Sequence, residues 1–189
     1  MVSPQKVANY AEGLNMPLSN VRRLRISKAQ KNDIKLWAEG VSLERDSGLS
    51  VDDLVRNAAV ERWRLALLQL RQGRAALRAM RPSYRAAISR FYYAMYHAAR
   101  AVVYLETTGD DHEEHRKLPA QLPTSLPSAN GKDWQNRLKD AREIRNNADY
   151  DPVPVAARHW RRNALHLESE AAELVSVARR SLQAKGCSL

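Results

Sequence analysis

The sequence is poor in the residues that define several other protein classes. Its 189 residues include one cysteine, Cys187, so neither an intrachain disulfide nor a multi-cysteine zinc site can form. No segment approaches the roughly 20 consecutive apolar residues that a membrane-spanning helix needs. Residues 1–13 have no apolar stretch typical of a secretory signal. We therefore predict a cytoplasmic protein that has no membrane span and needs neither a metal ion nor another cofactor.

Negative charge is also in short supply. The 31 Lys and Arg residues outnumber the 21 Asp and Glu residues, which gives a formal net charge of +10. A positive excess favours polyanionic partners such as RNA, DNA or anionic membranes. A helical protein can also carry many arginines on solvated helix faces, so the charge by itself leaves both interpretations open.

Glycine and proline are scarce, with seven and eight residues, and apolar residues recur at helical spacing. A short helix is predicted over residues 27–38, ended by Gly40, with a loop over residues 43–48. Longer helices are then predicted over residues 50–82, 83–107, 132–148 and 154–184. We expect an all-α fold, in which residues 50–189 form an antiparallel up-and-down four-helix bundle. Residues 1–49 are predicted to form a helical extension, to which the sequence assigns no role.

Residues 108–130 are predicted to form a loop with one short turn near residues 117–122. The segment Asp110–His115 contains carboxylates and two histidines, which are ligand types for a divalent metal. No regular element fixes their geometry, so we favour a solvated acidic loop over a metal site.

The predicted helix over residues 83–107 carries a stripe of basic and aromatic side chains. Its members are spaced by three and four residues and therefore lie on one face; they are Arg90, Tyr93, His97, Arg100 and Tyr104. Such a stripe can stack bases and bind phosphates. Alternatively, the tyrosines Tyr92, Tyr93 and Tyr96 are core rings with hydroxyls at the rim, which we favour. For His97 two roles stay open, an interior histidine or a proton-transferring group facing Arg145.

A second block, residues 145–152, ends the predicted helix over residues 132–148. Trp134, Leu138 and Arg145 share one helix face, so Arg145 is expected to point toward the bundle or a dimer seam. A desolvated arginine needs a carboxylate, a carbonyl or a phosphate. Pairing with Asp149, four residues later, and phosphate binding explain Arg145 equally well. For Asp149 and Tyr150 we favour a structural role.

Residues 84–101 resemble the second core helix of HEPN domains, and residues 141–150 resemble the signature near the end of their third helix. The resemblance covers about residues 55–182 and implies a helical bundle that commonly forms a homodimer. The family includes metal-independent endoribonucleases of toxin–antitoxin and phage-defence systems. It also includes non-catalytic members that bind RNA or nucleotides and often work with a minimal nucleotidyltransferase.

The nuclease motif of the family is an arginine, a polar residue, three to five further residues and a histidine. Arg145 and Asn146 match its start, but the positions for the histidine hold Tyr150, Asp151 and Pro152. Metal-free cleavage of RNA needs a base and an acid, whereas arginine can only stabilise charge. Asp149 beside Arg145 is expected to have a lowered pKa and to be a poor base.

The resemblance therefore implies an RNA- or nucleotide-binding module of a bacterial toxin–antitoxin or phage-defence system. The expected binding residues are Arg90, Tyr93, Arg100, Asp149 and Tyr150. The first alternative is an endoribonuclease toxin whose catalytic residues are Arg145, Asn146 and His97. The second is a target of a partner nucleotidyltransferase antitoxin, with Tyr150 as the modified residue.

Overall fold

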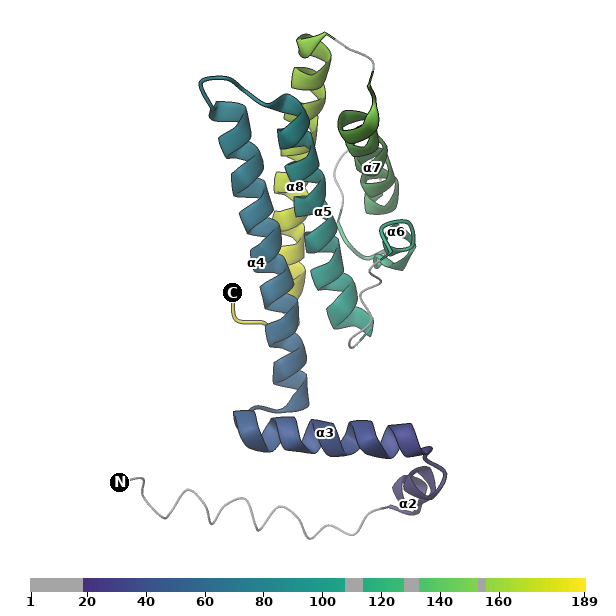
Figure 1. The fold of residues 1–189 in the computed structure, drawn as a ribbon. Coiled ribbons are helices and arrows are strands. Elements are labelled where there is room, and N and C mark those ends of the chain that lie inside the picture. Colours follow the sequence, from purple (N-terminus) through teal and green to yellow (C-terminus); the bar gives the residue numbers. More distant parts are fainter. Residues whose placement is uncertain (1–18, 108–113, 128–132, 153–155) are drawn as a thin grey trace, which may run out of the picture. The chain divides into compact units, whose positions relative to one another are not determined.

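The computed structural model describes residues 19–107, 114–127, 133–152 and 156–189 (Figure 1). Within these ranges the chain forms helices and no strand, which confirms the predicted all-α fold. The chain divides into two units, residues 1–49 and residues 50–189, and each has its own internal contacts. No helix in the described ranges is long and apolar enough to cross a membrane.

The first unit contains α2 (Asn20–Ser27) and α3 (Lys31–Ser47). The prediction of one helix over residues 27–38 and a loop over residues 43–48 was wrong, because Ser27 ends α2 and α3 continues through residue 47. Gly48, rather than Gly40, adopts the left-handed φ of +68° that ends this helix. The sequence offered no clear boundary because none of the described residues of α2 and α3 is buried.

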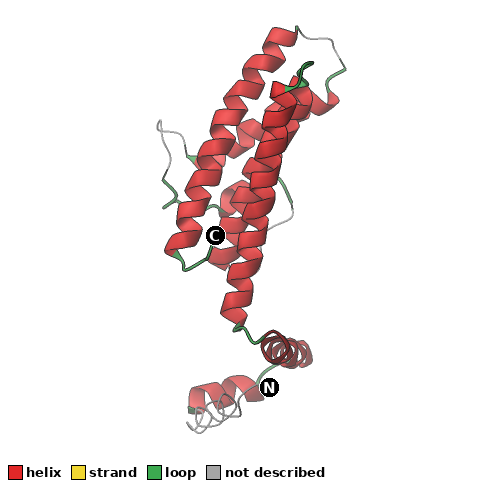
Figure 2. Ribbon diagram, turned by 90° about the vertical axis from the view of Figure 1, so that its left-hand side faces the viewer, coloured by secondary structure: helices red, strands yellow, loops and turns green. Residues whose placement is uncertain are grey.

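The second unit is built on α4 (Val51–Arg78), α5 (Tyr84–Thr107), α7 (Trp134–Tyr150) and α8 (Ala157–Ala184). Ser50 begins α4 as predicted, since its Oγ accepts a hydrogen bond of 3.1 Å from the Asp53 amide. These long helices run in alternating directions (Figures 1 and 2). Helices α4, α5 and α8 pack against one another, and α7 packs mainly against α5. Because α5 packs against α4, α7 and α8, its apolar residues form the centre of the core.

The short turn predicted near residues 117–122 is present as α6 (Leu118–Gln121). Leu118 and Pro119 are buried, and α6 packs against both α5 and α7. This packing places the turn Glu114–Lys117, which leads into α6, beside the middle of α5.

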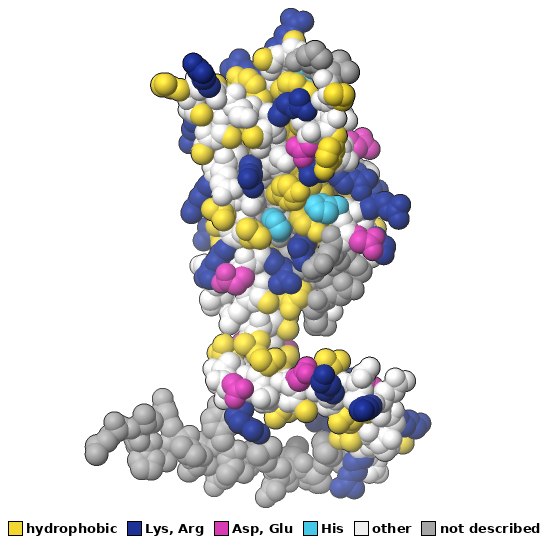
Figure 3. All heavy atoms as spheres, in the orientation of Figure 1, with side chains coloured by type: hydrophobic (Ala, Val, Ile, Leu, Met, Phe, Trp, Pro, Cys, Tyr) yellow, Lys and Arg dark blue, Asp and Glu magenta, His cyan; other side chains and the backbone are white. Residues whose placement is uncertain are grey.

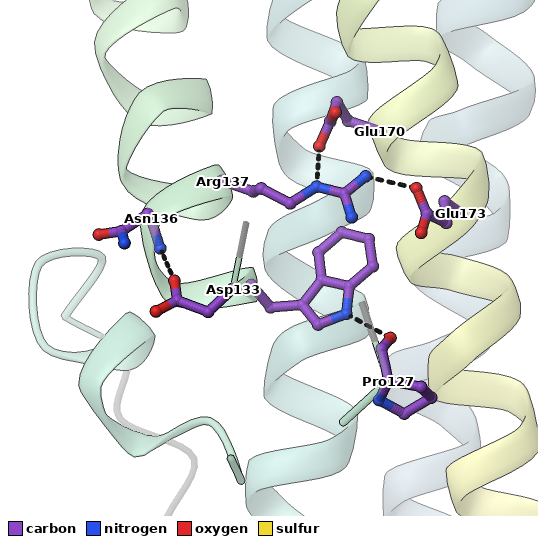
Figure 4. A network of polar contacts seen from close by, with 7 residues as sticks. Pro127, Asp133, Asn136, Arg137, Glu170 and Glu173 are labelled. Carbon is purple, nitrogen blue, oxygen red and sulfur yellow. Dashed lines mark hydrogen bonds and ion pairs between the residues drawn. The ribbon is translucent and has the colours of Figure 1, made fainter. Parts of the chain in front are cut away.

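An ionic cluster fastens α7 to α8 (Figure 4). The guanidinium of Arg137 donates to the carboxylates of Glu170 and Glu173 on α8, and its carbon lies 3.7 Å from the ring centroid of Trp134. Burial acts to lower the pKa of Arg137, but hydrogen bonds to Glu173 and Glu170 outweigh it and raise that pKa. With its side chain only 5% exposed, Arg137 holds the start of α7 against the bundle.

Candidate functional site

Arg145 lies on the last turns of α7 and faces α5. Its Nε is 2.7 Å from Asp149 Oδ2 on the same helix, and the two side chains are 18% and 24% exposed. Its Nη2 donates a 3.0 Å hydrogen bond to the Tyr93 hydroxyl on α5, and its Nη1 donates to Asn146 Oδ1 at 3.1 Å. Internal pairing, one of the two explanations that the sequence allowed, is therefore present.

The surroundings of Arg145 keep its charge in place. Burial acts to lower its pKa, but Asp149, Tyr93 and Tyr150 outweigh that effect, so the pKa lies above its usual value. The guanidinium carbon lies 5.5 Å from the ring centroid of Tyr93 and 5.4 Å from that of Tyr150. Arg145 is thus a permanent cation bordered by two aromatic rings, with part of its surface open to solvent.

The C-terminal end of α7 is held in position by Arg85 of α5. Its Nε donates to the carbonyl oxygen of Ala148, and its Nη2 donates to that of Asp151 at 3.0 Å. These are carbonyl groups that the end of a helix leaves without partners inside the helix. Ser89, one turn along α5, also donates to Asp149 Oδ2 at 3.3 Å. The contacts of Arg85 with the end of α7 and of Ser89 with Asp149 therefore both hold Arg145 against α5.

The tyrosines of α5 form a contiguous aromatic cluster. Tyr92 and Tyr96 are 1% and 4% exposed, so both are core rings, as we favoured from the sequence. Tyr93 is half-buried, and its ring stacks against His97 with centroids 6.2 Å apart. His97 also meets the edge of Tyr96 at 5.3 Å. His97 is thus linked to Arg145 through Tyr93, which contacts both.

The second histidine of this cluster comes from the turn before α6. His115 Nδ1 lies 2.6 Å from the Tyr92 hydroxyl, and its ring stacks on Tyr96 with centroids 4.0 Å apart and planes 6° apart. Burial lowers the pKa of His115, and the charges of Arg145, Arg142 and Arg100 lower it further. His115 therefore shares the rings of Tyr93 and Tyr96 with the guanidinium groups of Arg145 and Arg100.

Two further arginines border the cluster. Arg100 of α5 places its guanidinium carbon 5.6 Å from the ring centroid of Tyr96. Arg142 lies one turn before Arg145 on α7, and its buried Nε has no hydrogen-bond partner in the described structure. We call the whole group the basic–aromatic site, made of Tyr92, Tyr93, Tyr96, Arg100, His115, Arg142 and Arg145. Figure 3 shows histidine side chains on this face of the bundle, next to hydrophobic and basic groups.

Not all of the residues expected to act together meet in this site. Arg90 is exposed and its Nη1 donates to Gln69 of α4 at 3.1 Å, so it takes part in a different contact. Tyr104, at the other end of the stripe, is covered by Arg62, whose guanidinium carbon lies 3.9 Å from the ring centroid. Of the acidic loop, Asp110–Glu113 lies outside the described residues. The described residues contain no group of three or more potential metal ligands.

Sequence reasoning missed two members of the site. Arg142 stood beside Arg145 in the sequence but was not considered, although one helical turn separates the two. His115 was assigned to a solvated loop. The resemblance to HEPN domains offered one indication that His115 belongs to the site, since a histidine before a short helix is frequent in this family.

A protein-family model described as "HEPN domain" matches residues 59–186, which is more than half of the chain and includes every residue of the basic–aromatic site. No curated protein and no solved structure matches the chain.

Proposed function

The chain belongs to the HEPN domain family, and we propose that it binds RNA or a nucleotide through the basic–aromatic site. The observation that carries the proposal is the placing of two guanidinium groups beside one aromatic cluster: Arg145 borders Tyr93 and Arg100 borders Tyr96. The rings of Tyr93 and Tyr96 both contact the imidazole of His115. Guanidinium groups match the geometry of phosphate oxygens. The ring of Tyr150, which is 70% exposed and 5.4 Å from the Arg145 guanidinium carbon, can stack a base. Family membership points the same way, because at that level the chain is a nucleotide- or RNA-related module.

Asp149 is the internal competitor of such a ligand. It pairs with Arg145 in the free protein, so a phosphate has to replace it or share the guanidinium. Both side chains are partly exposed, and Arg145 has further donors besides the Nε that faces Asp149. A charge-assisted hydrogen bond to phosphate can substitute for the ion pair that is lost. Asp149 therefore reduces the affinity of the site for anions without preventing their binding.

We expect Arg145→Gln to weaken binding of single-stranded RNA about tenfold, because one charge-assisted phosphate contact is lost. Fluorescence anisotropy with a labelled oligouridylate measures this change. The control is Arg71→Gln, an exposed arginine of α4 whose loss changes the net charge equally. If the two variants bind equally well, the site is not at Arg145.

Binding of RNA at this site should also depend on salt. Phosphate contacts from Arg100, Arg142 and Arg145 predict a slope of about −2 for log affinity against log salt concentration.

Asp149→Asn is expected to strengthen the same binding several-fold, because the competing carboxylate loses its charge. Glu61→Gln, on the exposed surface of α4, changes the net charge equally and serves as the control. Weaker binding in Asp149→Asn than in Glu61→Gln would mean that Asp149 positions Arg145 rather than competing for it.

A metal-independent endoribonuclease is the second candidate, because two histidines, His97 and His115, contact the Tyr93 ring whose hydroxyl accepts a hydrogen bond from Arg145. In this reaction the 2′-hydroxyl attacks the adjacent phosphorus, a base takes its proton, and an acid protonates the leaving 5′-oxygen. The imidazole can take the first proton and, once protonated, deliver it to the leaving 5′-oxygen, while Arg145 stabilises the charge on the phosphorane. The test is cleavage of RNA in the presence of EDTA that both His115→Gln and Arg145→Gln abolish. A binding module retains RNA without cutting it.

The proposed setting is a bacterial toxin–antitoxin or phage-defence pair in which the chain forms a homodimer and meets a minimal nucleotidyltransferase. The exposure of Tyr150 supports the proposal that it is the modified residue, since 70% of it is accessible at the end of α7. Co-expression with the nucleotidyltransferase would then add mass to the wild-type chain and none to Tyr150→Phe. Sedimentation of the purified chain tests the homodimer.

A further inference from the structure

His115 is held in one place although it lies on a turn. The Tyr92 hydroxyl binds its Nδ1 at 2.6 Å, and the nearly parallel Tyr96 ring supports its face. The edge of Tyr93 approaches it as well, with ring centroids 5.9 Å apart. Buried Leu118 and Pro119 anchor the following residues in the core. The imidazole therefore has a fixed position in the site.

Within the described part of the chain, the charged groups around this imidazole come from three elements. From α5 there is Arg100, which borders the Tyr96 ring, besides the hydroxyls of Tyr92, Tyr93 and Tyr96. The same helix carries the titratable His97, which stacks on Tyr93. From α7 there are Arg142 and Arg145, the latter paired with Asp149. In its own turn, Glu114 pairs with Lys117 at 2.7 Å, and Arg116 is exposed. Among the described residues near the ring, cations outnumber carboxylates, which disfavours a proton on the ring.

The hydrogen bond between Tyr92 and His115 can persist when His115 becomes protonated. Burial raises the pKa of Tyr92, so its hydroxyl keeps its proton and can donate to Nδ1 when the ring carries its own proton on Nε2. A hydroxyl can also accept a hydrogen bond, so the same contact survives with its direction reversed once Nδ1 is protonated. Protonation of His115 therefore requires no movement of the ring away from Tyr92.

We propose that His115 binds the same phosphate group as the surrounding arginines and does so as a cation, so that ligand binding takes up a proton. The proposal rests on the proposed function of the site. A phosphate placed among the arginines offsets the positive field that keeps the imidazole neutral, and it adds an acceptor for the ring N–H groups. By reciprocal linkage, a ligand that favours the protonated ring is itself bound more tightly by it.

The direction of the pH dependence follows from this linkage. The ligand raises the pKa of His115, so the affinity increases as the pH falls from the pKa of the complex toward that of the free protein. Below the lower of these two values, the affinity is constant. One linked proton allows at most a tenfold change in affinity per pH unit within that window.

Calorimetric titration with an oligouridylate that lacks terminal phosphates tests the proposal, because its phosphodiesters do not titrate near neutral pH. We expect the wild-type chain to bind it roughly tenfold more tightly near pH 6 than near pH 8, within the range where histidine titrates. Repeating the titration in buffers of different ionisation enthalpy counts the protons, and we expect an uptake that averages about half a proton per bound oligouridylate between pH 6 and 8. Inorganic phosphate, titrated in parallel, shows whether a free anion satisfies the site or the polynucleotide is needed.

His115→Gln keeps an acceptor for Tyr92 but cannot take the proton, so its binding should lose the pH dependence. The control is His166→Gln, an exposed histidine of α8, which should behave like the wild-type chain. The inference would be overturned if the wild-type chain bound without proton uptake, or if His115→Gln bound with unchanged uptake. Either result would still be compatible with phosphate binding by the arginines. Absence of binding at both pH values would overturn the proposed function as well.

A measurement on the unaltered chain guards against a variant that does not fold. Side-chain NMR of the histidines should give His115 a pKa below its usual value in the free protein and a higher pKa after the oligouridylate is added. An unchanged His115 pKa in the presence of bound RNA would contradict the proposal directly.

Discussion

Arg137→Ala is expected to lower the free energy of unfolding by about 3 kcal/mol, because it leaves two carboxylates near the core without their shared cation. The Arg137 side chain is 5% exposed, and those of Glu170 and Glu173 are 19% and 31% exposed. The glutamates can therefore recover some hydration, which places the estimate at the lower end of the range for a broken buried ion pair. The contact with the Trp134 ring is lost as well. Urea denaturation followed by circular dichroism measures the change.

Two further variants separate the charge effect from simple loss of packing. Arg74→Ala breaks the Arg74–Glu168 pair, whose side chains are 38% and 25% exposed, and should cost less than about 1 kcal/mol. The combined variant Arg137→Met, Glu170→Gln, Glu173→Gln removes all three charges and should be more stable than Arg137→Ala. If the combined variant is the less stable of the two, the cluster contributes net stabilisation rather than avoiding a penalty.

The long helices could be predicted from sequence because their signals are local. Buried apolar residues recur every three or four positions in α4, α5 and α8, and Ser50 carries its own capping signal. The N-terminal unit has no such signal. In α3 the apolar residues Ile34 and Trp37 lie on one face, whereas Leu36 and Leu43 lie nearly opposite, and all four are exposed. An apolar pattern divided between two faces gives no clear period, which explains why the helix boundaries there were wrong.

The site could be predicted only in part, for a related reason. Arg145 and Asp149 are four residues apart, so helical geometry alone predicted their pairing. His115 and Tyr92 are separated by 23 positions in the sequence and meet only because α6 folds back against α5 and α7. Arg137 was overlooked because its partners are on α8, and no local pattern shows which turns of two distant helices will face each other. Contacts within one helix were accessible to sequence reasoning, and contacts between elements were not.

The close approach of α4 to α5 is set by Gly73, and it bears directly on the site. A Cβ atom at this position would lie 2.5 Å from Cε1 and 2.7 Å from Cδ1 of the Phe91 ring. Phe91 is fully buried, so the ring cannot move toward solvent to make room. The next two residues of α5 are Tyr92 and Tyr93, which contact His115 and Arg145. A displacement of Phe91 would therefore be transmitted to the site.

Gly73→Ala is expected to destabilise the bundle by about 2 kcal/mol. Alanine favours a helix interior over glycine by about 1 kcal/mol, but inserting a methyl group into a closely packed core costs up to about 3 kcal/mol. Denaturation of Gly73→Ala, Phe91→Leu and the double variant measures the coupling between the two positions. The smaller leucine should relieve the clash, so Phe91→Leu should cost less in the Gly73→Ala background than in the wild-type chain. A Gly73→Ala variant more stable than the wild-type chain would show that the ring has room to turn, and that helix propensity rather than packing decides at this position.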